Sequence, residues 1–130
     1  MKSKLKFGII FLLIVFSFGC QNDEMDNETL IGSWKQIESS ISSGGPQYII
    51  EIENGEELMF FTNGRFTSNR ISDCSTGNYF NNSDELFLYY DCSKYEKVQT
   101  YQITFESDFL ILVPTSVICI EGCSYKYKRL

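Results

Sequence analysis

The chain has 130 residues, of which 43% are hydrophobic, and its 11 basic and 17 acidic residues give a net charge of −6. It contains no histidine, which excludes nucleophile pairs of serine or cysteine with histidine and removes the commonest protein ligand of zinc. The acidic balance, without a stripe of lysine and arginine, argues against nucleic-acid binding. We therefore expect a protein that is not an enzyme and that binds no cofactor, no metal and no nucleic acid.

The first 19 residues have the pattern of a secretory signal. Lys2, Lys4 and Lys6 form a basic start, and an apolar run follows over residues 7–18. A dozen apolar residues are too few for a helix that spans a bilayer, which needs about 20. They suit the hydrophobic region of a signal peptide, which we predict over residues 1–19.

The leader ends in Ser17-Phe18-Gly19-Cys20, which resembles the lipobox of bacterial lipoproteins, where small residues precede an obligatory cysteine. The resemblance implies that Cys20 becomes the mature N-terminus and that its thiol receives a diacylglyceryl group, with palmitate among the acyl chains. Two or more acyl chains anchor a protein stably, whereas one chain binds only marginally. The alternative is cleavage at another position, which would leave Cys20 as a plain thiol.

Residues 20–29 follow as a polar and acidic tether. No aspartate comes directly after Cys20, so the inner-membrane retention signal of some bacteria is missing. Acidic residues after one or two polar residues look like the surface-export signal of certain Gram-negative lipoproteins. We expect an anchor in the outer membrane with the domain at the cell surface. A periplasm-facing anchor is the alternative, and a merely solvated tether would explain the same composition.

Without the leader, about 110 residues remain, enough for one small domain over residues 30–130. Loss of three lysines leaves eight basic against 17 acidic residues, a net charge near −9. This charge repels phospholipid headgroups, so the lipid at Cys20 is the membrane contact that we expect.

From Leu30 onward the pattern is β almost throughout. We predict strands over residues 32–37, 48–52, 57–62, 65–68, 76–80, 86–90, 98–105, 109–113, 117–119 and 123–128. Asn-Gly pairs at 54–55 and 63–64 indicate hairpins with type I′ turns, residues 42–46 read as a loop, and Pro114 ends a strand. Short turns between many strands favour an all-β fold, an eight-stranded antiparallel up-and-down barrel rather than a sandwich.

Four cysteines follow Cys20, and an even number in an exported domain suggests two disulfides with three connectivities. We favour Cys74–Cys92 and Cys119–Cys123. The latter pair would flank a three-residue hairpin loop that ends in glycine, which places the two cysteines opposite each other.

Cys74 and Cys92 lie symmetrically about Ser83, so a hairpin centred there would bring them together. If Tyr79 shares the core face with Leu86 and Leu88, however, the strand register must shift by one residue. One β-bulge would reconcile the two demands.

The segment Leu30-Ile31-Gly32-Ser33-Trp34-Lys35 looks like the G-x-W opening strand of lipocalins, and residues 57–66 and 119–128 look like parts of the small lipocalin-like lipoproteins of bacteria. The resemblance covers residues 30–130. It implies an eight-stranded barrel whose cup holds a small hydrophobic molecule. It also implies that Trp34, following Gly32, plugs the closed end and stacks on a cation from the last strand, Lys128 or Arg129.

Aromatic side chains are the candidates for lining this cup. They are Phe60, Phe66, Tyr79, Tyr89 and Tyr101. A cup lined by aromatic rings, with a few phenolic hydroxyls that orient a ligand, would serve a non-catalytic binder or carrier. The alternative is that these side chains simply fill the interior of the barrel. The protein would then be a rigid, surface-exposed module that binds another protein and no small molecule.

Overall fold

The computed structural model describes residues 30–42, 44–92, 98–116 and 122–130. All nine elements in these ranges are strands. They are β1 (Gly32–Ile41), β2 (Tyr48–Glu51), β3 (Glu57–Phe60), β4 (Arg65–Ser68), β5 (Thr76–Asn82), β6 (Glu85–Tyr90), β7 (Gln99–Glu106), β8 (Phe109–Pro114) and β9 (Cys123–Arg129). These ranges contain no helix that is long and apolar enough to cross a membrane.

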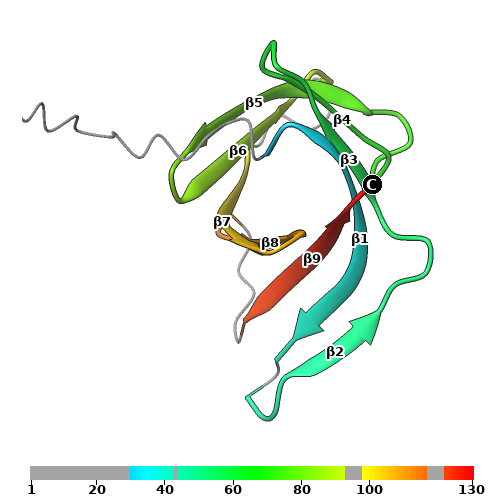
Figure 1. Ribbon diagram of the computed structural model, residues 1–130, viewed down its shortest axis with the longest axis vertical. Coiled ribbons are helices and arrows are strands. Elements are labelled where there is room, and N and C mark those ends of the chain that lie inside the picture. Colours follow the sequence, from blue (N-terminus) through cyan, green and yellow to red (C-terminus); the bar gives the residue numbers. More distant parts are fainter. Residues whose placement is uncertain (1–29, 43, 93–97, 117–121) are drawn as a thin grey trace, which may run out of the picture.

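Eight of the strands close into an antiparallel barrel, as predicted (Figure 1). From β3 to β9 each strand pairs with the next in the chain, and β1 pairs with both β3 and β9. The closing ladder runs from Trp34 opposite Arg129 to Ile41 opposite Cys123. Every residue of the described core lies in these strands except Leu30, which precedes β1, so a chain that starts at Gln21 contains the whole described core.

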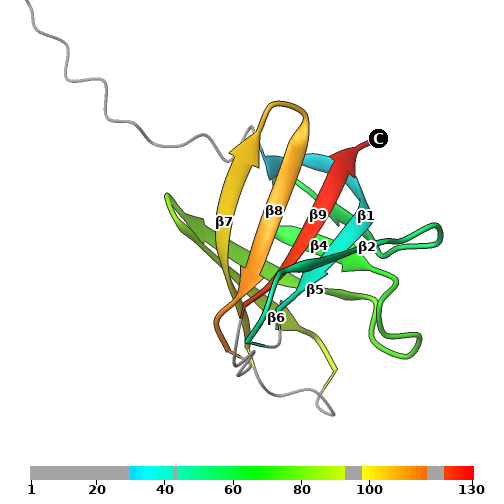
Figure 2. The same cartoon turned by 90° about the horizontal axis from the view of Figure 1, so that it is seen from below.

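β2 lies outside the closed ring, which makes the hairpin predicted at residues 54–55 wrong. β3 pairs with the first half of β1, from Gly32 to Lys35, whereas β2 pairs with the second half, from Glu38 to Ile41. β2 therefore lies beside the second half of β1, outside the closed ring, and it does not pair with β3 (Figures 1 and 2).

The change of partner along β1 occurs at a bulge between Gln36 and Glu38, where the register opposite β9 shifts by one residue. Gly55 passes this point so closely that an added Cβ would lie 2.1 Å from the carbonyl oxygen of Gln36. Only glycine fits there. The Asn-Gly pair at 54–55 thus serves a close crossing of two backbones, and Gly55 does not adopt the positive φ of a type I′ turn.

The hairpin predicted at residues 63–64 forms between β3 and β4, but its turn is of another type. Gly64 has a φ of 80°, whereas Asn63 does not have a positive φ. The Gly64 amide donates to the Phe61 carbonyl at 3.3 Å, and the Phe61 amide donates to Arg65 at 2.9 Å. These bonds define a type I turn followed by a left-handed glycine.

Alternate residues of the strands point inward and form one core. The buried members are Leu30, Trp34, Leu58, Phe60, Phe66, Leu86, Leu88, Tyr101, Ile103, Leu110, Leu112 and Tyr127. Four partly buried rings, those of Tyr79, Tyr90, Phe105 and Tyr125, pack against this cluster. The middle of the barrel is thus occupied by side chains of the protein itself.

The predicted disulfide Cys74–Cys92 is present, with Cα atoms 5.8 Å apart. In the β5–β6 ladder, Tyr79 lies opposite Leu88, which is the register that the shared core face demanded. The predicted bulge is not needed, since the described β5–β6 ladder is regular. Both cysteines lie just beyond the strands, so they can meet although the strand register differs by one residue from the one that would place them directly opposite each other.

Several sequence predictions fall outside the described residues: the signal peptide, the lipidation of Cys20, the acidic tether and a strand over 117–119. Cys123 is disulfide-bonded, and Cys119, its expected partner, lies outside the described residues as well.

Candidate functional site

One end of the barrel is closed by Trp34, as the resemblance implied. The indole ring is almost fully buried, and its Nε1 donates to the Leu30 carbonyl at 2.8 Å. The guanidinium carbon of Arg129 lies 4.1 Å from the ring centroid, and its Nη1 donates to the Ile31 carbonyl at 3.0 Å. Gly32 leaves room for this side chain, because an added Cβ would lie 3.0 Å from Nη1.

Lys128, the other cation considered for this stacking, has a different place. It is exposed, and it lies opposite Lys35 and Phe109 in the ladders that flank β9. Since neighbouring residues of a strand point to opposite faces, Lys128 lies on the outer face of the barrel while Arg129 faces inward.

The aromatic side chains expected to line a cup are divided between three environments. Phe60, Phe66 and Tyr101 are buried in the packed core. Tyr79 is partly buried and donates its hydroxyl to the Phe61 carbonyl at 2.7 Å. Tyr89 is 45% exposed on the outer face, so its placement in a cup is wrong. Its neighbour Leu88 faces the core, which forces Tyr89 outward.

A polar cluster occupies the end of the barrel opposite Trp34. At this end β4 and β6 finish and β7 and β9 begin; it is the lower end of the barrel in Figure 2. We call this end the mouth and define the mouth cluster as Glu56, Ser68, Arg70, Tyr101, Tyr125 and Tyr127. Most of its side chains face the interior, because they continue the alternation of inward and outward residues along the strands in which, or next to which, they lie.

The carboxylate of Glu56 is the centre of the mouth cluster, and its side chain is only 6% exposed. It accepts hydrogen bonds from the hydroxyls of Ser68 at 2.6 Å and Tyr127 at 2.7 Å. An ion pair joins it to the guanidinium of Arg70 at 2.9 Å. A buried charge is tolerated when it is paired and hydrogen-bonded in this way.

Arg70 reaches from this buried carboxylate to the solvent. Its side chain is 31% exposed, its guanidinium lies 5.0 Å from the centroid of the Tyr125 ring, and Nη1 is 3.5 Å from the hydroxyl of Tyr101. Burial works against its charge, but the pKa of Arg70 is raised above its ordinary value because the charge of Glu56 and the nearby tyrosines favour the cation. Arg70 is therefore a fixed positive charge.

The hydroxyls of Tyr127, Tyr101 and the neighbouring Tyr90 stay neutral at physiological pH. Burial raises the pKa of Tyr127 well above its ordinary value, and the adjacent charge of Glu56 raises it further. Burial likewise raises the pKa of Tyr101 and Tyr90, with Arg70 acting in the opposite direction. The hydroxyl of Tyr127 is bonded to Glu56, and that of Tyr101 to Gln99 and Arg70. The partly exposed groups of the mouth cluster are therefore Arg70 and Tyr125.

The sequence contained a signal for the mouth cluster. Glu56 precedes Leu58 and Phe60 at the spacing of one strand face, and Arg70 follows Ser68 at the same spacing. Alternation with buried positions therefore points both charged side chains inward.

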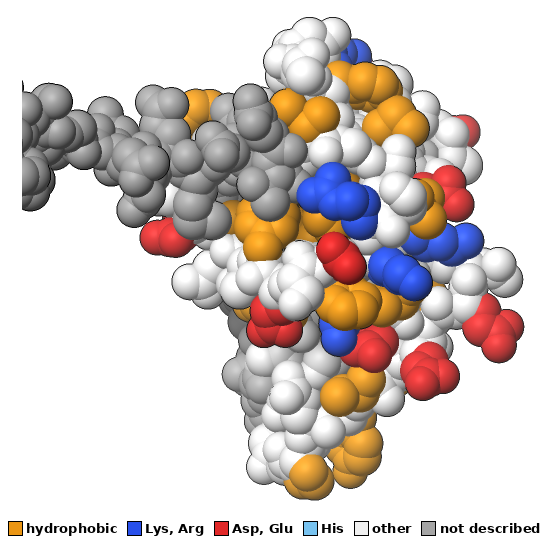
Figure 3. All heavy atoms as spheres, viewed as in Figure 1, with side chains coloured by type: hydrophobic (Ala, Val, Ile, Leu, Met, Phe, Trp, Pro, Cys, Tyr) orange, Lys and Arg blue, Asp and Glu red, His pale blue; other side chains and the backbone are white. Residues whose placement is uncertain are grey.

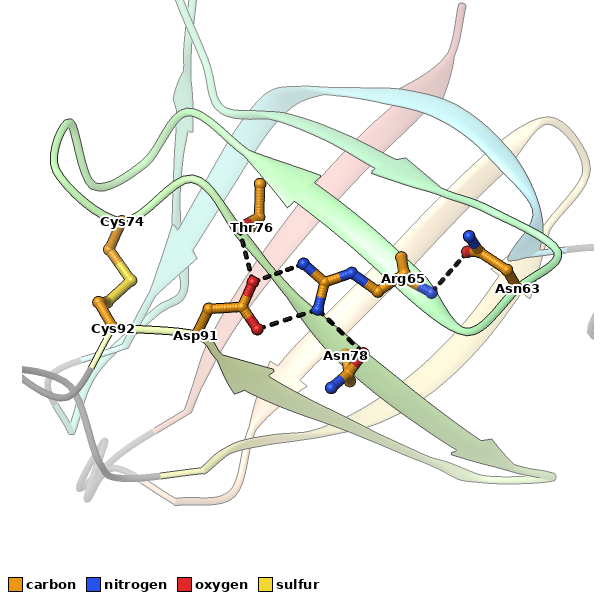
Figure 4. A network of polar contacts seen from close by, with 7 residues as sticks. All are labelled: Asn63, Arg65, Cys74, Thr76, Asn78, Asp91 and Cys92. Atoms are coloured by element: carbon orange, nitrogen blue, oxygen red, sulfur yellow. Dashed lines mark hydrogen bonds and ion pairs between the residues drawn. A yellow bond between two sulfur atoms is a disulfide. The ribbon is translucent and has the colours of Figure 1, made fainter.

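A second polar network lies on the outer face of the barrel, near the disulfide (Figure 4). Asp91 accepts hydrogen bonds from Arg65 and from the Thr76 hydroxyl at 2.7 Å, and Arg65 also donates to Asn78 at 3.1 Å. Hydrogen bonds from Arg65 and Thr76 lower the pKa of Asp91 to about 2. This network ties β4 to β5 and to the end of β6, which is a structural role.

A surface groove of about 390 Å³ also lies outside the barrel. Outward residues of β1, β3 and β4 line it together with the segment that follows β4, among them Ser33, Met59, Thr67 and Ile71. Ser68 of the mouth cluster also borders this groove, but Glu56 and Arg70 do not.

Comparison with known proteins shows the fold alone. No family model matches the chain, and no curated protein matches it significantly. Among solved structures, an uncharacterized protein from Bacteroides eggerthii superposes with a TM-score of 0.51 at 13% sequence identity. The match covers 77% of this chain and 98% of that protein.

Proposed function

We propose that this chain is a lipid-anchored, non-catalytic, lipocalin-like binding protein of the outer membrane. Its ligand is a small hydrophobic molecule with an acidic or hydrogen-bond-accepting group, held at the mouth. The observation that carries the proposal is Arg70, a partly exposed guanidinium fixed between a buried carboxylate and the ring of Tyr125.

Arg70 retains hydrogen-bonding capacity after its internal contacts are made. A guanidinium has five N–H donors in a planar fork, and the contacts with Glu56 and Tyr101 leave donors for a further acceptor at the exposed edge. Ligand sites typically combine apolar and aromatic surface with a few polar groups that fix orientation. The tyrosine rings around Arg70 supply the apolar part of such a site.

The packed core determines how deep the ligand sits. Phe60, Phe66 and Leu88 fill the middle of the barrel, and Trp34 with Arg129 closes the far end. The apolar part of the ligand therefore rests among the rings of the mouth, in a shallow position near the solvent.

The test is a binding titration with a fluorescent fatty-acid analogue and with its uncharged methyl ester. The wild-type chain from Gln21 should bind the acid more tightly than the ester. Arg70→Met should remove this preference, while Arg65→Met, which removes the arginine of the outer network, should keep it. Equal affinity for acid and ester in the wild type, or loss of the preference in both variants, would contradict the proposal. Circular dichroism should first show that each variant is folded.

The anchor is tested in the full-length chain. Cys20→Ser should abolish incorporation of labelled palmitate and should release the protein from the membrane fraction, because the thiol is the attachment point. Digestion of intact cells with a protease then separates the two orientations: loss of the protein indicates the cell surface, and protection indicates the periplasmic face.

A further inference from the structure

β2 is the strand that the rest of the molecule covers least. All four of its residues are exposed, and Tyr48, Ile49 and Ile50 have exposed fractions of 60%, 66% and 47%. Ile41, which lies opposite Tyr48 at the end of β1, is 44% exposed. Figure 3 shows hydrophobic side chains at the lower tip of the molecule, where Figure 1 places β2. Tyr48, Ile50 and Ile41 lie on one face of the β1–β2 pair, and exposed apolar patches mark interaction sites.

One edge of β2 is open. Within the described residues β2 stands at the end of the sheet order and pairs with β1 alone. The Ile52 amide donates to the Ile37 carbonyl at 2.8 Å. Since bonded and outward-pointing residues alternate in an antiparallel pair, the backbone groups of Ile49 and Glu51 point away from β1. They form an unused ladder edge.

Of the features that protect free strands, β2 has a short length of four residues and the charge of Glu51. Within the described residues it has no lysine, proline, bulge or covering segment at this edge, and residues 47–53 read Gln-Tyr-Ile-Ile-Glu-Ile-Glu. The strand is also separate from the closed ring, so a partner could pair with it while the barrel stays unchanged.

The edge is complementary to itself in one register. If two copies of β2 pair in antiparallel fashion about Ile50, each Tyr48 faces Ile52 of the other copy, and the two Ile50 side chains face each other. On the other side of the strand, Ile49 faces Glu51. Apolar residues then meet along one whole face, and no carboxylate lies directly opposite another. Pairing of like charges, which would be destabilising, is thus avoided.

We infer that β2 joins two copies of this chain into an antiparallel dimer whose two-fold axis passes between the Ile50 residues. A closed isologous interface of this kind is the commonest arrangement of homo-oligomers. Each copy carries a net charge near −9 without the leader, so the copies repel each other at long range. Salt screens this repulsion, and dimerisation should strengthen as the ionic strength increases.

The first experiment measures molecular mass by sedimentation over a range of concentrations, with the chain from Gln21. The wild type should show a concentration-dependent dimer. Ile50→Lys, which places two ammonium groups across the axis, should weaken dimerisation by about tenfold or more. Phe80→Lys is the matched control, because Phe80 is an apolar residue on the outer face of β5 that is at least as exposed as Ile50, at 58% against 47%, and it should leave the dimer intact. A wild type that stays monomeric, or a dimer lost only in Phe80→Lys, would overturn the inference.

The second experiment tests the register and does not depend on the stability of the lysine variant. In the proposed dimer Ile50 faces its own copy across a non-hydrogen-bonded pair, with Cα atoms about 4.5 Å apart, within reach of a disulfide. Under mild oxidation Ile50→Cys should form covalent dimers much faster than Tyr48→Cys, whose nearest cross-strand neighbour is Ile52. Equal rates, or faster cross-linking of Tyr48→Cys, would overturn the inference.

Discussion

Removal of Arg70 should destabilise the barrel more than removal of its partner Glu56. The side chain of Glu56 is only 6% exposed. In Arg70→Met its carboxylate loses the cation and keeps only the hydroxyls of Ser68 and Tyr127. Breaking a buried ion pair from one side costs about 3–5 kcal/mol. The two remaining hydrogen bonds and the partial exposure of Arg70 reduce our expectation to about 2–3 kcal/mol.

The opposite change is expected to cost less. Glu56→Gln leaves the cation of Arg70 without its partner, but Arg70 reaches the solvent, so we expect a loss of about 1 kcal/mol. Urea unfolding of both variants and of the double variant gives the coupling energy between the two side chains. We expect a coupling of about 1–2 kcal/mol. A coupling below about 0.5 kcal/mol, or a greater loss in Glu56→Gln than in Arg70→Met, would refute this reasoning.

Three further predictions concern other parts of the barrel. Arg129→Met should lower the free energy of unfolding by about 1–2 kcal/mol through loss of the cation–π contact and one hydrogen bond. It should also shift the fluorescence emission of Trp34, the single tryptophan. An unchanged emission spectrum would contradict the stacking of Arg129 on Trp34. Replacement of Cys74 and Cys92 by alanine should lower the free energy of unfolding by about 3 kcal/mol, measured by thermal or urea unfolding, as expected for a disulfide that closes a loop of this length. A loss below about 1 kcal/mol would contradict this expectation. The pKa values of Tyr101 and Tyr127 are raised in the folded state, whereas tyrosines of the unfolded chain ionise at their ordinary pKa of 10, so the folded state should lose stability as the pH rises above 10. In an alkaline titration followed by tyrosinate absorbance, these two phenols should ionise only as the barrel unfolds. Titration of all tyrosines at a pH below the unfolding transition would disprove this.

The closed barrel could be predicted from the sequence because its determinants are local. Alternating apolar residues and short turns specify each hairpin from β3 to β8, and the pairing of β1 with β9 follows once such a meander curls. The outward position of Tyr89 followed from the same alternation, given that Leu88 faces the core. The inward position predicted for Tyr89 could therefore have been corrected from the sequence alone.

The position of β2 and the contacts of the mouth cluster could not be derived in this way. Asn54-Gly55 has the local signature of a hairpin turn, but the close approach of Gly55 to Gln36 depends on a bulge in a distant strand. Alternation shows that Glu56 and Arg70 point inward, but their meeting depends on how the barrel closes. Long-range register, rather than residue preference, determines these two features.

The central claim is that the mouth binds a small acidic, hydrophobic ligand, and chemical-shift mapping tests it most directly. Backbone amide spectra of the chain from Gln21 are recorded during titration with a medium-chain fatty acid. Saturable shifts should concentrate at Ser68, Arg70, Tyr101 and Tyr125. Shifts centred on Trp34 at the plugged end or on the outer face around Tyr89, or spectra that do not change, would contradict the claim.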